Sequence, residues 1–77
     1  MQVTEVFSYL ARRTGKSARA LSLSMGRAET WARNSAGRDT KLSTAATLAD
    51  LAACDLAIID RKTGERLGTI EPPRRAE

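Results

Sequence analysis

The chain has 77 residues, enough for one small domain with a single core and too few for a catalytic cleft between subdomains. Thirteen Lys and Arg residues outnumber nine Asp and Glu residues, so the net charge is +4, which favours a polyanionic partner. Histidine is absent and Cys54 is the only cysteine, which excludes a histidine-based catalytic triad, an internal disulfide and an ordinary zinc site. We therefore expect no enzyme, no metal and no cofactor.

The sequence also bears on where the protein works. No apolar run approaches the roughly 18 to 20 residues of a bilayer-spanning helix, and the first residues lack the pattern of a secretory signal. A single cysteine suits a reducing compartment. Without a histidine or second cysteine to activate it, Cys54 is expected to be a plain buried or interface residue rather than a reactive thiol. We expect a cytoplasmic protein with no membrane partner.

The first predicted element is an amphipathic helix from Val3 to Thr14 that ends near Gly15. Its apolar residues recur at steps of three and four, which places them on one face: Val3, Val6, Phe7 and Leu10. A second helix follows, with Ser17 as a suitable N-cap because its hydroxyl can accept a hydrogen bond from an early backbone amide. Leu21 and Met25 would supply the buried side of this helix, which ends at Gly26.

A third helix is predicted from about Ala28 to Ser35, after a tight turn at residues 25–27 and before Gly37. The side opposite its buried face carries four residues with base-reading chemistry: Glu29, Thr30, Arg33 and Asn34. Arg33 can bind guanine with two hydrogen bonds, and Asn34 can do so with adenine. Glu29 can accept from the cytosine amino group, and Thr30 can meet a thymine methyl. The alternative for each is a residue of an ordinary solvated helix face.

Further polar and basic residues are expected at helix starts and loops around this helix, where DNA phosphates would pass: Ser17, Arg19, Arg27, Arg38 and Lys41. Such contacts would fix the register of the protein without reading sequence. Trp31 is the only tryptophan. It could anchor the core or its edge, as large aromatic residues usually do, or project toward DNA.

The polar segment 38–41 is predicted to be a loop, followed by a fourth helix that Ser43 or Thr44 would cap. Leu48, Leu51 and Ala52 would face inward, and the alanine-rich stretch 45–53 favours helix and close packing.

After Asp55 the apolar pattern changes to alternation, which predicts a β-hairpin with Gly64 at a positive φ in its turn. A two-stranded hairpin is marginally stable alone and has free edges, so it could pair with a second copy. The candidate dimer-interface residues are Ile58, Ile59, Leu67 and Ile70. Pro72 and Pro73 end the ordered structure, before a basic tail.

In this order the elements resemble the Cro and phage-repressor type helix-turn-helix regulators, the XRE class, and specifically short bacterial or prophage members that end in a hairpin. The similarity covers roughly Val3 to Ile70. It is carried by Leu21, Gly26, the Ser43-Thr44 pair, the Leu48-Ala49-Asp50 run and the turn at Asp60 to Glu65 with Thr63-Gly64-Glu65. The resemblance implies a mainly α fold: a four-helix lambda-repressor-like helix-turn-helix domain (residues 1–54), a hairpin that could dimerise (55–71) and a disordered basic tail (72–77).

The resemblance further implies a sequence-specific DNA-binding transcriptional regulator, a repressor that binds a palindromic operator as a homodimer and reads bases with its third helix. Ala18, Ala28 and Ala32 depart from the class, which has larger or polar residues at these positions. Two alternatives therefore stay open. One is an antitoxin that binds its own promoter and masks a toxin, and the other is a protein-interaction domain that has lost DNA binding.

Overall fold

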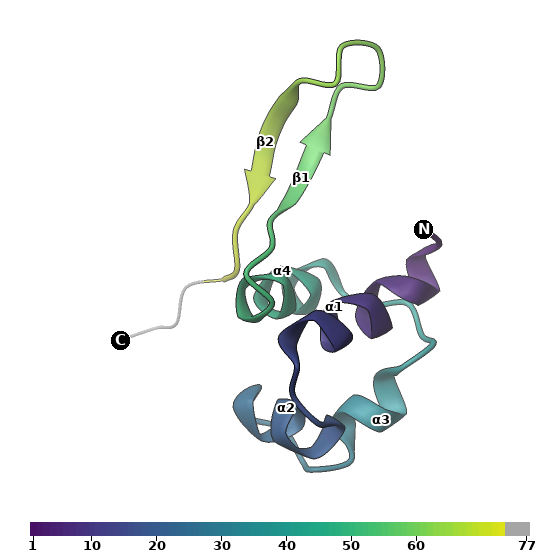
Figure 1. The fold of residues 1–77 in the computed structure, drawn as a ribbon, viewed down its shortest axis with the longest axis vertical. Helices are drawn as coiled ribbons and strands as arrows, with labels where there is room; N and C mark the ends of the chain where they lie inside the picture. The colour runs from purple at the N-terminus through teal and green to yellow at the C-terminus, as the bar shows by residue number, and fades with distance from the viewer. Residues whose placement is uncertain (74–77) are drawn as a thin grey trace.

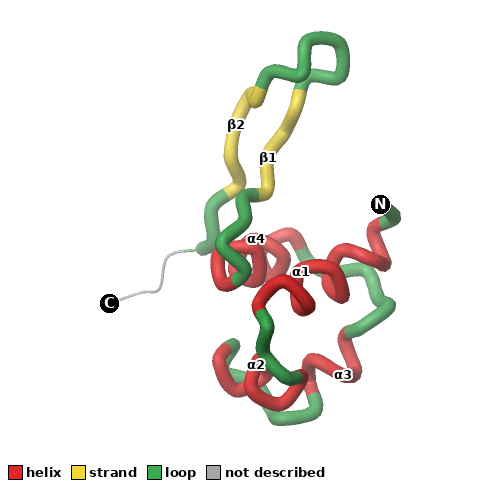
Figure 2. The backbone as a smooth tube through the Cα atoms, viewed as in Figure 1, coloured by secondary structure: helices red, strands yellow, loops and turns green. Residues whose placement is uncertain are grey.

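The computed structural model describes residues 1–73, and within them a short 3-10 turn and four α-helices precede an antiparallel hairpin (Figure 1). The elements are η1 (Val3–Glu5), α1 (Val6–Thr14), α2 (Ala18–Ser24), α3 (Trp31–Ser35), α4 (Leu42–Leu51), β1 (Leu56–Ile59) and β2 (Arg66–Ile70). The predicted order of four helices followed by a hairpin is confirmed. Figure 2 shows the hairpin as an arm that extends away from the helices.

The four helices enclose one small core. Its largest fully buried apolar side chains are Phe7 from α1, Leu21 from α2 and Leu48 from α4. Alanines such as Ala32 and Ala49 complete the core, and their short side chains let the helix backbones approach closely. The core therefore joins α1, α2, α3 and α4 into one body.

Three predicted details of the first and fourth helices are wrong. Val3 is exposed, because the chain begins with a 3-10 turn before the regular helix and its apolar face start at Val6. Neither Ser43 nor Thr44 caps α4, because the Lys41 carbonyl already accepts the first intrahelical bond from Ala45 at 2.9 Å.

Leu51 is partly exposed rather than inward-facing. The buried face of α4 is centred on Ala45, Ala49 and Ala52, and Leu51 lies to one side of that centre.

The helices α2 and α4 end in the same way with different residues. In α2, the amide of Arg27 donates to the Ser22 carbonyl at 2.9 Å, and Gly26 has φ 71°. In α4, the amide of Cys54 donates to the Ala49 carbonyl at 2.8 Å, and the left-handed position is taken by Ala53 with φ 57°. Alanine carries a Cβ that disfavours this conformation, so the end of α4 is strained where the end of α2 is not.

The hairpin pairs Leu56 with Ile70 at its base and has an irregularity between Ile58 and Ile59. Its turn contains the predicted glycine at positive φ, Gly64, with φ 75°. The Asp60 carboxylate accepts hydrogen bonds from the amides of Lys62 and Thr63 at 2.8 and 3.1 Å. These bonds favour the ionised form and lower the pKa of Asp60 below its ordinary value.

Leu56 and Cys54 pack against the helical core, so the base of the hairpin is attached to the body. Pro72 is half-buried. Most of the predicted basic tail, residues 74–77, lies outside the described residues. Across residues 1–73, no helix combines the length and the apolar character that crossing a bilayer requires.

Candidate nucleic-acid interface

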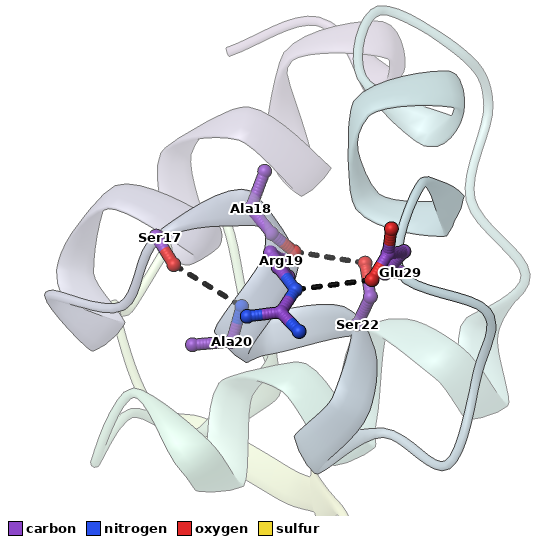
Figure 3. Close-up of polar contacts among 6 residues, drawn as sticks. All are labelled: Ser17, Ala18, Arg19, Ala20, Ser22 and Glu29. Carbon is purple, nitrogen blue, oxygen red and sulfur yellow. Dashed lines mark hydrogen bonds and ion pairs between the residues drawn. The ribbon is translucent and has the colours of Figure 1, made fainter.

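The helices α2 and α3 are joined by one buried hydroxyl, that of Ser22. The Ser22 side chain is fully buried, donates to the Ala18 carbonyl at 2.8 Å, and accepts from the Ala32 amide at 2.8 Å. Figure 3 shows the first of these bonds within α2. Thr30 at the start of α3 makes no side-chain cap, so Ser22 satisfies an amide in the first turn of α3 from the neighbouring helix. Ser22 thereby fixes where α3 lies.

Sequence reasoning missed this role of Ser22. The available signal is a small polar residue directly after Leu21, at a position that turns inward on α2. A hydroxyl in that place needs a buried partner, but the sequence does not say that the partner is the backbone of another helix.

The third helix is shorter than predicted and begins at Trp31 rather than Ala28. The amide of Trp31 bonds to the Ala28 carbonyl at 2.9 Å, which makes residues 28–30 a turn. The last hydrogen bond of α2 is the one that the Arg27 amide donates, so residues 28–30 form the connection that turns the chain into α3. Glu29 and Thr30 consequently precede the helix instead of lying on it.

The four predicted base-reading residues are all exposed but only partly brought together. Arg33 and Asn34 lie on the exposed side of α3, and Thr30 lies one turn before Asn34, whose amide donates to the Thr30 carbonyl at 3.1 Å. Glu29 is engaged elsewhere, because its Oε2 atom accepts from Arg19 Nε of α2 at 3.0 Å (Figure 3). In this pair two predicted DNA contacts neutralise each other, although a pair 73% and 61% exposed contributes little to stability.

Ser17 performs its predicted capping role at the start of α2. Its Oγ accepts from the Ala20 amide at 3.1 Å (Figure 3). The hydroxyl proton is not used in this bond, so the exposed Ser17 can still donate to an anion.

Trp31 lies at the edge of the core. Its ring meets Phe7 edge to face, with centroids 5.3 Å apart and planes at 79°. The guanidinium carbon of Arg27 lies 5.4 Å from the centroid of the same ring, in the range of a cation–π contact. Trp31 thus holds a cation at the surface while it packs against the core.

Three of the predicted phosphate contacts line one hollow of about 230 Å³, which we call the basic hollow. Arg27, Arg38 and Lys41 contribute its positive charge, and Trp31 contributes its aromatic wall. Asp39 also lines it, which leaves a net positive charge at the site. The loop between α3 and α4 therefore converges with the turn after α2 on a place suited to a phosphate group.

The hairpin leaves three of its four predicted interface residues more than half exposed. The exposed fractions are 58% for Ile58, 52% for Ile59 and 60% for Leu67. Ile58 and Ile59 are neighbours on β1 at the irregularity of the strand pairing, and both are exposed, so the arm presents apolar surface there. Ile70 is half-buried where it pairs with Leu56 at the base.

Cys54 is half-buried and packs against the core, as expected of a plain structural cysteine. Its Sγ accepts a hydrogen bond from Arg13 Nε at 2.9 Å. This contact raises the pKa of Arg13, which stays a cation at every physiological pH.

No family model matches the chain, and no curated protein or solved structure gives a significant match.

Proposed function

We propose that this protein is a sequence-specific DNA-binding transcriptional regulator of the Cro and phage-repressor type, a cytoplasmic repressor that binds a palindromic operator as a homodimer. In this proposal α2, the turn at residues 25–30 and α3 form the helix-turn-helix. The observation that carries the proposal is the position of Arg33 and Asn34 on the exposed side of α3, a helix tied to α2 by Ser22 and adjacent to the basic hollow.

Only a few residues can contact bases, because α3 runs only from Trp31 to Ser35. Arg33 fits the major-groove edge of guanine and Asn34 that of adenine, since each offers paired hydrogen bonds in one plane. Thr30, one turn before Asn34, would contact a thymine methyl. Glu29 reads cytosine only after its ion pair with Arg19 opens, so we assign it a secondary role.

Phosphate binding falls to the residues around the basic hollow. Arg27 is held against Trp31, so it loses less side-chain freedom on binding a phosphate than an unrestrained arginine would. Arg38 and Lys41 approach the same hollow from the loop before α4. Ser17 and Arg19 at the start of α2 would bind a further stretch of the backbone.

A palindromic operator requires the two copies of α3 to lie about 34 Å apart, one turn of DNA, and we assign the pairing of the two copies to the hairpin. The support for it is the exposure of Ile58, Ile59 and Leu67 on an arm with free edges. Sedimentation at tens of micromolar protein tests this part, and a monomer there would contradict it.

The base-reading and phosphate roles are separable by two substitutions. We expect Arg33→Ala to cost about 1 to 3 kcal/mol of binding free energy on the operator and to relax the preference at one base pair. Arg38→Ala should weaken binding to all sequences alike and reduce the salt slope by about one. Arg61→Ala, in the hairpin turn, is the matched control and should bind like the unmodified protein.

These outcomes are read from fluorescence anisotropy on an operator duplex and a scrambled duplex across a salt series. Equal losses on both duplexes for Arg33→Ala and Arg38→Ala would contradict the division of roles.

One observation favours a function without DNA. The Arg19–Glu29 pair engages two predicted DNA contacts with each other in the unbound protein, and a domain that binds protein through another surface would keep this pair intact. In that case the double substitution Arg33→Ala with Asn34→Ala would leave the affinity for the partner unchanged. The exposed hairpin would then bind the partner. In the antitoxin alternative, by contrast, α2 and α3 still bind the promoter while the hairpin masks the toxin.

A further inference from the structure

A second hollow differs in chemistry from the basic hollow and lies between α1, α2 and α3. Its volume is about 370 Å³, and we call it the apolar groove. Its walls carry short side chains over the buried side chains of Phe7 and Leu21; these short residues are Ala11, Ala18, Ala32 and Ala36. Pockets that hold small molecules are mostly apolar and have about this size.

The rim of the apolar groove is positive. Arg12, Lys16 and Arg33 line it, and no Asp or Glu of residues 1–73 does. None of these three cations takes part in an ion pair in the described part of the chain. An occupant that fits both walls and rim has an apolar body and a negatively charged end.

We propose that the apolar groove binds a small carboxylic acid with an aliphatic or aromatic body. The body displaces water from the alanine-lined walls, and the carboxylate is held by Arg12, Lys16 and Arg33 at the rim. A bare phosphate fits the polar basic hollow better than this apolar groove.

The groove also has a consequence for DNA binding, which rests on the proposed function. Arg33 is the side chain assigned to guanine, so a carboxylate that holds Arg33 at the rim competes with the base. The acid would therefore act as an effector that releases the operator.

The experiment uses octanoate as the probe and amide NMR of the full chain as the readout. We expect millimolar octanoate to shift the amides of Ala11, Ala18, Ala32 and Ala36, while the hairpin amides stay unchanged. Octan-1-ol has the same apolar chain without the charge, so it should bind at least tenfold more weakly. Shifts confined to other parts of the protein, or equal binding of the alcohol, would overturn the proposal.

Two variants test the apolar wall and the charged rim of the groove separately. Ala36 is exposed and follows α3, so Ala36→Leu should fill the mouth of the groove without disturbing the core and weaken octanoate binding at least tenfold. Arg12→Gln should weaken it severalfold, and Arg61→Gln, in the hairpin turn, should leave it unchanged. Unaltered octanoate affinity in both groove variants would overturn the site.

Anisotropy with an operator duplex then tests the effector role. Octanoate at saturation should weaken operator binding at least tenfold, and Ala36→Leu should bind the operator without responding to octanoate. Octanoate binding with unchanged operator affinity would overturn competition. If the protein binds no DNA, the proposed function fails, while the NMR titration still decides whether the groove binds the acid.

Discussion

The helical body buries a set of apolar side chains, although Leu23 and Leu42 stay exposed, whereas no apolar side chain of the two strands is fully buried. The body buries Phe7, Leu21 and Leu48 almost completely, whereas the hairpin leaves Ile58 and Leu67 more than half exposed. A small set of helices can close around one core, but a two-stranded ribbon has no second layer to cover its faces. We infer that the body carries the stability of the monomer and that the hairpin supplies surface for association.

The largest expected effect is on the free energy of unfolding, when one leucine is shortened to alanine in the helical body and, for comparison, one in the hairpin. Leu48→Ala should lower the free energy of unfolding by about 2 to 5 kcal/mol, because it removes packed methyl groups and leaves a cavity. Leu67→Ala, on the exposed arm, should change it by less than about 0.5 kcal/mol at concentrations where the protein is monomeric. Urea unfolding followed by circular dichroism measures both, and similar losses would contradict the different roles of the helical body and the hairpin.

The next largest effect is expected from removing the Ser22 hydroxyl, which holds α3 against α2. Ser22→Ala should cost about 1 to 3 kcal/mol of unfolding free energy, because the buried Ala32 amide loses its acceptor. Ser24→Ala, at an exposed position of the same helix, is the control and should lie within about 0.5 kcal/mol of the unmodified protein. Chemical denaturation measures both variants. Equal unfolding free energies would contradict the role of Ser22.

The junction between the two regions can be strengthened. Ala53→Gly should stabilise the protein by about 0.5 to 1 kcal/mol, because glycine adopts the left-handed conformation at the end of α4 without strain. Ala20→Gly, inside α2, should destabilise by a similar amount, since its backbone is helical and glycine has more freedom to lose there. Thermal unfolding that moves in the same direction for both would refute this account of Ala53.

The smallest effect is a pH dependence confined to the hairpin. The pKa of Asp60 is lowered in the folded state, so its contribution is complete above the ordinary pKa of 3.8 and is lost as pH falls through the folded pKa. The NMR amide signals of Lys62 and Thr63 should shift as the pH is lowered from 5 to below 3.8, where Asp60 becomes protonated. In Asp60→Asn the two signals should no longer follow this titration, and an identical titration in the variant would exclude Asp60 as the cause.

Local signals in the sequence predicted the order of the elements. Gly15 and Gly26 mark helix ends, and Gly64 marks the hairpin turn, because each occupies a conformation that glycine favours. Ser17 was identifiable as the cap of α2 from its hydroxyl and position. The start of α3 was not predictable, because it depends on Ser22 of another helix and on the path of the chain after α2.

The candidate site was predictable in its residue types and not in its arrangement. Arg27, Arg38 and Lys41 were identifiable as exposed cations, but their convergence on one hollow depends on how the α3–α4 loop returns past Trp31. The pairing of Arg19 with Glu29 joins two elements, and sequence spacing alone does not reveal it. The apolar groove likewise arises only when alanines from three helices meet.

DNA reading by α2 and α3 is best tested by binding to the DNA that the proposed regulator would control. Fluorescence anisotropy should compare the purified protein on DNA from upstream of its own coding sequence and on a scrambled duplex, each across a salt series. We predict tight binding to the upstream duplex alone and a steep salt slope on both duplexes. No binding to either duplex at moderate salt would contradict the account.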